Sequence, residues 1–444
     1  MRDFPLSMLD TANSENFWKD CEELLHVVAA NKISSPIFGQ RLQALVYGRL
    51  KKAVDANKIE TVDSVDHAAL AVGRRTSIGT VEFSKFSTPG PLLALQQKQR
   101  HLANEGKGSP LTIATDTIVQ RFETDPEDPL NRPSILHTSR GALRFSKTTT
   151  NLVLAAGAFP NTTILMNSVG EQLKGRAGSR VSGHFLTQIV ARFPIPRSAE
   201  NPERPLSKHL EIGAHYMAGK DSTSDLQYHV QITAIHSPRP ETDAEDAARL
   251  SPDQAGAATF EQLKDSGQHI VLVCAALGEL DELDTGSWFK HDPNNPDVTT
   301  NSHLQVLLSE KAERLWDVMD QVTYDAINVM AGGVSNDIEY WSHSNVPSVP
   351  PGWSRDQPPQ CMIRVPGIVH ETATLYMSDD LETDPHASVD SDYRPHSCHN
   401  VFVTGGALFP TSGSWNPTLT MCGFAQDLAK KLHEVRKSET SSPS

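Results

Sequence analysis

The sequence has few cysteines, and none of them has the spacing that binds a metal or builds a disulfide framework. The five cysteines are odd in number, far apart and never in Cys-x-x-Cys spacing: Cys21, Cys274, Cys361, Cys398 and Cys422. This pattern excludes a zinc knuckle and favours free thiols in a reducing compartment. We therefore predict no metal site and a cytoplasmic location.

Long apolar runs and an excess of positive charge are also missing. No window approaches the roughly 18 apolar residues of a membrane-spanning helix, and the first residues do not read as a signal peptide. The formal net charge of −14 argues against nucleic acid or an anionic membrane as the main partner. Hydrophobic residues make up 38% of the 444 positions, so an extensive core is expected.

Three common catalytic or nucleotide-binding motifs are absent as well. His370-Glu371 begins like a zinc His-Glu-x-x-His, but Thr374 occupies the position of the second histidine. No Gly-x-Ser-x-Gly occurs, which excludes the nucleophile elbow of an α/β-hydrolase. Gly106-x-Gly108 is followed by Leu111 where a third glycine would complete a dinucleotide-binding loop.

The apolar patterns that are present predict an α/β fold with an α+β insertion. Residues 14–30 and 36–56 have helical spacing, and we place a helical segment at 1–105. A β-rich run covers 111–122, and a buried strand at 150–157 leads into a helix at 158–168, as in a parallel sheet. Strand-like runs at 185–193, 226–234 and 270–277, and a helix at 309–330, indicate an inserted antiparallel sheet with helical cover. An acidic stretch at 238–254 is expected to be an exposed loop.

Two polar residues near the end of the chain stand out as candidates for chemistry. A short strand at 401–403, the Gly405-Gly406 turn and a loop lead to Asn416-Pro417, where a helix is expected to begin. Backbone N–H groups at such a turn can approach a ligand closely. His370 lies 46 positions before Asn416, in a frame of small residues.

With these motifs the chain resembles the glucose–methanol–choline (GMC) oxidoreductases, flavoenzymes that oxidise alcohols, and locally their pyranose 2-oxidase branch. The similar segments are 111–122, 151–168, His370 with its flanks, 388–400, and Asn416-Pro-Thr-Leu-Thr420. The resemblance implies an FAD cofactor, a small-molecule alcohol substrate and an incomplete Rossmann-like domain beside an antiparallel substrate domain. The resemblance is also compatible with a homo-oligomer.

The resemblance also assigns roles. It implies that His370 and Asn416 are catalytic, with the imidazole accepting the hydroxyl proton and the amide donating to the developing alkoxide. The residues implied to contact the cofactor are Val119, Ala155, Ala156, Gly157, Gly405, Gly406, Pro417 and Thr418. The implied domains are FAD-binding at 106–180 and 356–435, substrate-binding at 181–355, and a tail at 436–444.

One feature of that family is missing: its N-terminal ADP-binding unit with Gly-x-Gly-x-x-Gly. Three interpretations follow. The chain is an active flavin enzyme with a truncated recorded start or a compensating fold, a homologue without FAD that acts as a binding protein, or half of an enzyme completed by another chain.

The substrate is not readable from the sequence. Tyr228, His229, Gln231 and Trp288 are candidates for lining its site, and family analogy points to fungal carbohydrate, aryl-alcohol or secondary-metabolite oxidation. Four further histidines are interpreted as structural: His184, His386, His396 and His399.

Overall fold

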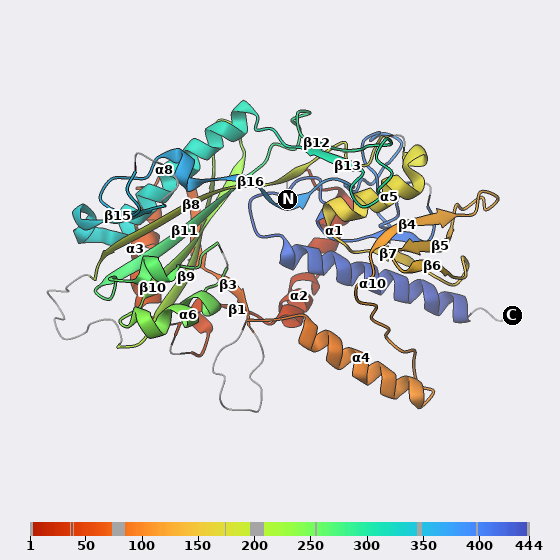
Figure 1. The fold of residues 1–444 in the computed structure, drawn as a ribbon, viewed down its shortest axis with the longest axis horizontal. Coiled ribbons are helices and arrows are strands. Elements are labelled where there is room, and N and C mark those ends of the chain that lie inside the picture. The colour runs from red at the N-terminus through yellow and green to blue at the C-terminus, as the bar shows by residue number, and fades with distance from the viewer. Residues whose placement is uncertain are drawn as a thin grey trace.

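A computed structural model describes residues 3–35, 37–38, 40–72, 85–173, 175–195, 208–253, 255–343, 349–396 and 398–441. The chain is a mixed α/β protein dominated by one large antiparallel sheet, which lies at the left of Figure 1, with a second group of elements at the right. None of the helices in the described ranges combines the length and the apolar character that crossing a bilayer requires.

The large sheet has the order β15-β14-β8-β11-β10-β9-β2, with β16 also pairing with β8, and every pairing is antiparallel. Its strands are β2 (Val62–His67), β8 (Ser182–Pro194), β9 (Glu211–Lys220), β10 (Gln227–His236), β11 (His269–Glu279), β14 (Glu339–Ser342), β15 (Gly352–Ser354) and β16 (Arg364–Thr372). Strand β11 is a near-continuous apolar run because both of its faces are covered, whereas β10 alternates between apolar and polar residues.

One face of this sheet is the main core. Helices α3 (Gln40–Asp55) and α8 (Glu310–Ala331) pack on it, with Leu42, Val46 and Met319 among their buried side chains. Ser309 caps α8 by accepting a hydrogen bond from the Ala312 N–H. The other face is covered near one end by α6 (Pro240–Leu250) and α7 (Phe260–Leu263), and elsewhere it carries the polar residues described below.

The second group of elements surrounds a two-stranded parallel pair, β7 (Leu152–Leu154) and β17 (Val401–Val403). Helix α5 (Ala158–Leu173) follows β7, and α10 (Thr418–Ser441) follows β17. Their apolar side chains share a second core. The remaining elements of this group are α1 (Leu6–Ala12), α2 (Phe17–Leu25), β4 (Val119–Thr124), β5 (Pro133–Thr138), β6 (Gly141–Arg144) and η3 (Gly406–Leu408).

Two short strand pairs and one long helix lie outside these two groups: β1 (Val27–Ala29) with β3 (Ala69–Ala71), β12 (Trp288–His291) with β13 (Ser302–Gln305), and α4 (Pro89–Asn104), which projects at the bottom of Figure 1. The short helical turns are η1 (Ala30–Lys32), η2 (Gly332–Asp337) and α9 (Gln360–Ile363). Residues 1–105, expected as a helical segment, contribute to both cores, since α3 packs on the large sheet and β2 joins it, while α1 and α2 pack against α10.

Three local predictions are wrong. The stretch 238–254, expected as an exposed loop, contains helix α6, which buries Ala247 and Leu250; Gln254 itself lies outside the described residues. Residues 111–115 form no strand, and β4 begins only at Val119. The helix expected over 14–30 ends at Leu25, because His26 adopts a left-handed conformation (φ +52°) and β1 follows. Of the expected tail, residues 442–444 also lie outside the described ranges.

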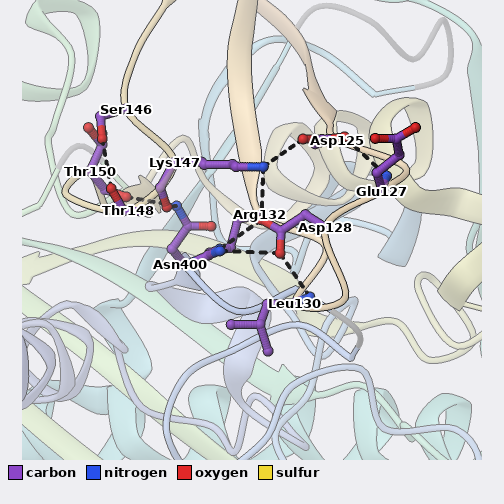
Figure 2. Close-up of polar contacts among 10 residues, drawn as sticks. All are labelled: Asp125, Glu127, Asp128, Leu130, Arg132, Ser146, Lys147, Thr148, Thr150 and Asn400. Carbon is purple, nitrogen blue, oxygen red and sulfur yellow. Dashed lines mark hydrogen bonds and ion pairs between the residues drawn. The ribbon is translucent and has the colours of Figure 1, made fainter.

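The loop between β4 and β5 is tied to the start of β17 by a polar network (Figure 2). The side chain of Arg132 donates to the carboxylate of Asp128, and the ammonium of Lys147 contacts Asp125 at 2.6 Å. The amide of Asn400 donates to the carbonyls of Lys147 and Thr150, at 3.2 and 2.8 Å. The network therefore joins the antiparallel hairpin to the strand that precedes the Gly-Gly turn.

Candidate active site

Polar side chains gather on the face of the large sheet opposite α3 and α8. His184 lies on β8, Tyr216 on β9, and His229 and Gln231 on β10. Gln231 pairs with Tyr216 in the β10–β9 register, so their side chains stand side by side. The intervening residues of these strands point into the main core, which fixes the direction of the polar set.

The loop from Pro410 to Asn416 crosses this face and is held to it by hydrogen bonds to side chains of the sheet. The Nε2–H of His184 donates to the carbonyl of Gly413 at 3.0 Å, and the Nδ1–H of His229 donates to the carbonyl of Ser414. Thr411 donates to the buried carboxylate of Glu279 at 2.7 Å. The loop that carries Asn416 is therefore positioned by the sheet.

Asn416, predicted to be catalytic, is oriented by two neighbours on the sheet. Its Oδ1 accepts a hydrogen bond from the Nε2 of Gln231 at 3.1 Å. The same Gln231 amide lies 3.4 Å from the Nε2 of His229. The Asn416 side chain also hydrogen-bonds Tyr216, whose hydroxyl is buried and has a pKa raised to about 12. With Oδ1 occupied as an acceptor, the Asn416 amide is left to act as a donor.

His370, the second residue predicted to be catalytic, lies on the irregular strand β16. Its backbone is left-handed (φ +58°), and the pairing of β16 with β8 shifts register on either side of Val369. Bulges of this kind re-aim a side chain near a functional site. The Nδ1 of His370 lies 3.0 Å from the Nδ1 of His184, and the two rings meet edge to face.

All three imidazoles of this cluster are held neutral. Burial, followed by the neighbouring His370 and His229, lowers the pKa of His184 to about 3. Burial lowers the pKa of His229 to about 4 and also lowers the pKa of the partly buried His370, which the carboxylates of Asp253 and Glu371 partly counter. The ring centres of His184 and His229 lie 6.5 Å apart. His370 contacts His184, and Asn416 is linked to His229 through Gln231. His370 and Asn416 therefore belong to one cluster.

Sequence reasoning missed several members of this cluster. His184, interpreted as structural, contacts His370. Trp415 stacks on His229, with the ring centres 5.1 Å apart and an angle of 9° between the ring planes. Gln188 donates to the carbonyl of Ala255 and so holds the segment after α6 over the polar face. Each contact joins residues more than 60 positions apart, and no local pattern signals it.

Of the four residues expected to line the substrate site, two face the polar cluster and two do not. His229 and Gln231 lie in it, as described. Tyr228 points to the opposite face, where it is fully buried and hydrogen-bonds Thr61 at 2.8 Å. Trp288 lies on the separate β12–β13 ribbon beneath the ammonium of Lys290. The alternation of β10 explains Tyr228, since adjacent residues of a strand point to opposite faces.

Most residues expected at the cofactor lie at one edge of the parallel pair. Leu154 pairs with Val403, so Ala155-Ala156-Gly157 and Gly405-Gly406 follow the carboxyl ends of adjacent parallel strands. Residues 155–157 are exposed, and α5 begins directly after them. In open α/β sheets this edge is where ligands bind.

Asn161 on α5 holds the two turns together. Its side-chain oxygen accepts from the N–H of Ala156 at 2.8 Å, and its amide donates to the carbonyls of Leu154 and Thr404. The hydroxyl of Thr404, beside the turn, is buried and has no hydrogen-bond partner among the described residues.

Gly405 and Gly406 are required for different reasons. Gly405 has φ +94° and ψ −166°, a region that only glycine adopts readily, and the space around it is open. A side chain at Gly406 would lie 2.8 Å from the carbonyl oxygen of Glu371. The second glycine therefore lets the turn pack against the strand that carries His370.

The other three predicted cofactor residues have mixed positions. Val119 is partly buried at the start of β4 and packs against the second core. Pro417 is buried directly before α10, and Thr418 is the exposed first residue of that helix. Thr418 thus lies at a helix N-terminus, close in sequence to Asn416.

Residues 308–425 match the family model described as GMC oxidoreductase, in its C-terminal part. The structure is similar to the crystal structure of pyridoxine 4-oxidase from Mesorbium loti, with a TM-score of 0.53 and 12% identity over 98% of this chain and 81% of that one. At this identity the likeness concerns the fold alone. No curated protein matches the sequence.

Proposed function

We propose that this chain carries the substrate side and the flavin-facing side of an FAD-dependent oxidoreductase that oxidises an alcohol. The observation that supports this most strongly is that His370 and Asn416 lie in one cluster of neutral polar groups, where they are linked through His184, His229 and Gln231. Both residues lie within the segment that matches the GMC oxidoreductase model.

The cluster has the two groups that alcohol oxidation needs from a protein. A neutral imidazole accepts the hydroxyl proton, and the lowered pKa of His370 keeps it neutral at ambient pH. Asn416 cannot titrate, and because its Oδ1 accepts from Gln231, its amide N–H groups are the ones that would donate to the oxygen on which negative charge develops. Because Tyr216 stays protonated, the neighbouring hydroxyl adds no competing base.

The edge of the parallel pair fits one end of FAD. The exposed 155–157 turn, the open space around Gly405 and the unpaired Thr404 hydroxyl would line it. Bound FAD would supply the acceptor for the hydride that leaves the carbinol carbon. The residues of this chain bind and orient the alcohol and take its proton.

A second candidate function is supported by the same edge. Parallel sheets are usually buried and have several strands, but β7 pairs only with β17 among the described strands, and Val153 is 40% exposed. The chain that it resembles in fold is also longer, since 81% of that chain is covered. As the alternative, we propose that FAD binding needs a further α/β unit beside β7, and that the chain acts as a binding protein without that unit.

Titration with FAD, followed by an assay on a panel of primary and secondary alcohols with an electron-accepting dye, tests the proposal. We expect quenched flavin fluorescence and alcohol-dependent dye reduction with equimolar formation of a carbonyl product. Alcohol binding without any flavin binding would favour the alternative. Absence of both would overturn the assignment.

A further inference from the structure

His184 is a buried histidine with a defined partner on each nitrogen. Its side chain is completely shielded from solvent on β8. One nitrogen, Nε2, lies 3.0 Å from the carbonyl oxygen of Gly413, and the other, Nδ1, lies 3.0 Å from the Nδ1 of His370. A histidine with both nitrogens engaged has a fixed ring orientation and a fixed tautomer.

The direction of each hydrogen bond follows from the chemistry of the partners. A backbone carbonyl only accepts, so the Nε2 of His184 carries the proton. A neutral imidazole has one N–H, which leaves a lone pair on the Nδ1 of His184. The Nδ1 of His370 must therefore donate, and the lone pair of His370 is on Nε2.

We propose that His184 is a positioning residue that holds His370 as its Nδ1–H tautomer, with the Nε2 lone pair turned to the substrate hydroxyl. This inference rests on the proposed function for its catalytic meaning, but not for its geometry. When the alcohol is oxidised, the hydroxyl proton is transferred to the Nε2 of His370. The Nδ1–H remains in place, so only one nitrogen is available to the substrate.

The surroundings favour this role over a second base. The groups that face the pair are His229, at 6.5 Å between ring centres from His184, and the carboxylates of Asp253 and Glu371 near His370. Both carboxylates stabilise a positive charge on His370, whereas His184 is buried among neutral groups and its Nε2–H is committed to Gly413. The transferred proton therefore stays on His370.

Two substitutions separate positioning from packing. Asparagine at this position places its side-chain oxygen near the former Nδ1 and keeps an acceptor for His370, whereas leucine keeps the volume and removes the acceptor. His215→Leu is the matched control, because His215 is equally buried on β9 but faces α3 and not the cluster.

The first readout is nitrogen NMR of the full chain labelled on histidine, which needs no flavin. We expect a protonated Nδ1 and an unprotonated Nε2 for His370 in the wild type, in His184→Asn and in His215→Leu. In His184→Leu we expect a mixture of tautomers. An unchanged His370 tautomer in His184→Leu would overturn the proposal.

The second readout is turnover of the FAD-loaded protein. His184→Leu should lower kcat by about 10–100-fold with little change in KM, as for other residues that orient a reacting side chain, and His184→Asn should restore most of it. If both His184 variants match the wild type while turnover falls by about 10²–10⁴ in His370→Asn, the positioning role fails and the proposed function stands. If the wild type itself does not turn over, the proposed function fails and the NMR result still decides the tautomer.

Discussion

His370 has a backbone conformation that most side chains avoid. A left-handed residue other than glycine costs about 1–2 kcal/mol, and asparagine tolerates this region better than other side chains. His370 has a φ of +58° at a bulged point of β16, and this strained backbone directs its imidazole toward the cluster.

Replacing His370 by asparagine should therefore separate activity from stability. We expect turnover to fall by about 10²–10⁴, because the proton acceptor is lost, while the melting temperature stays within a degree or two. Steady-state kinetics and thermal unfolding measure the two effects. Retention of wild-type turnover would show that His370 does not accept the proton.

The two glycines of the turn offer a second test at this scale. Gly405→Ala and Gly406→Ala should each destabilise the protein by about 1–3 kcal/mol, through backbone strain and through a clash with the Glu371 carbonyl respectively. Gly48→Ala is the control, because Gly48 is exposed on α3 with open space around it. It should stabilise by about 0.5–1 kcal/mol. Denaturant unfolding measures all three, and a neutral Gly406→Ala would contradict the packing argument.

At the scale of elements, the Asp128 carboxylate anchors the β4–β5 loop in the network of Figure 2, through Arg132 at 2.8 Å and Lys147 at 3.6 Å. The hydrogen bond from Arg132, with further contributions from a backbone N–H and the charges of Arg132 and Lys147, lowers the pKa of Asp128 to about 2. Because the folded pKa is below the ordinary value near 4, the ionised carboxylate stabilises the fold above about pH 4. This stabilisation is lost as the pH falls toward 2.

Asp128→Asn should consequently lower the melting temperature at pH 7, and the difference from the wild type should shrink steadily between about pH 4 and pH 2. Thermal unfolding across that range measures it. Asp116→Asn is a suitable control, since Asp116 is an exposed carboxylate that lies 3.9 Å from the guanidinium of Arg140, its nearest cation in the described part of the chain. A difference that is constant with pH would show that Asp128 acts through packing and not through its charge.

The same scale shows what the sequence could predict. Helix α8 and strands β8, β10 and β11 follow from long apolar patterns. The sequence does not predict strand β9, because its glycines and alanines have little preference for strands. Its pairing with β10 and β2 forms it in the folded sheet. The high charge of helix α6 predicts a loop, yet Pro240 at its start and its acidic first turn are signals of a helix N-terminus.

The sequence predicts the two candidate catalytic residues of the site but not the residues that contact them. His370 and Asn416 stand in recognisable local motifs, so their sequence neighbourhoods sufficed. Their partners His184 and Gln231 are set by strand register and by which face each strand turns to the core. Register is a property of the assembled sheet, so no single stretch of sequence carries it.

For the molecule as a whole, the cluster lies where the two cores meet. Strand β16 pairs with β8 in the large sheet, and directly after it Leu375 and Met377 are buried in the second core. The N–H groups of these two residues donate to the carbonyls of Ala407 and Leu408 beside the Gly-Gly turn. A ligand at the edge of the parallel pair would therefore stabilise the segment that carries His370.

FAD should accordingly stabilise the whole fold. At a hundredfold excess over its dissociation constant it contributes about 2.7 kcal/mol, which corresponds to a rise of several degrees in melting temperature. Differential scanning fluorimetry with an extrinsic dye measures this, and adenosine diphosphate should have a smaller effect. Equal stabilisation by both ligands would contradict binding at the turn.

The most direct test of the central claim is anaerobic mixing of the FAD-loaded protein with a saturating alcohol, followed by the flavin absorbance. We predict that the flavin band bleaches in the wild type. The rate of bleaching should fall about 10²–10⁴-fold in His370→Asn, and it should fall further when the carbinol hydrogen is replaced by deuterium. A protein that holds FAD but shows no bleaching with any alcohol, or the same rate in the His370 variant, would contradict the account.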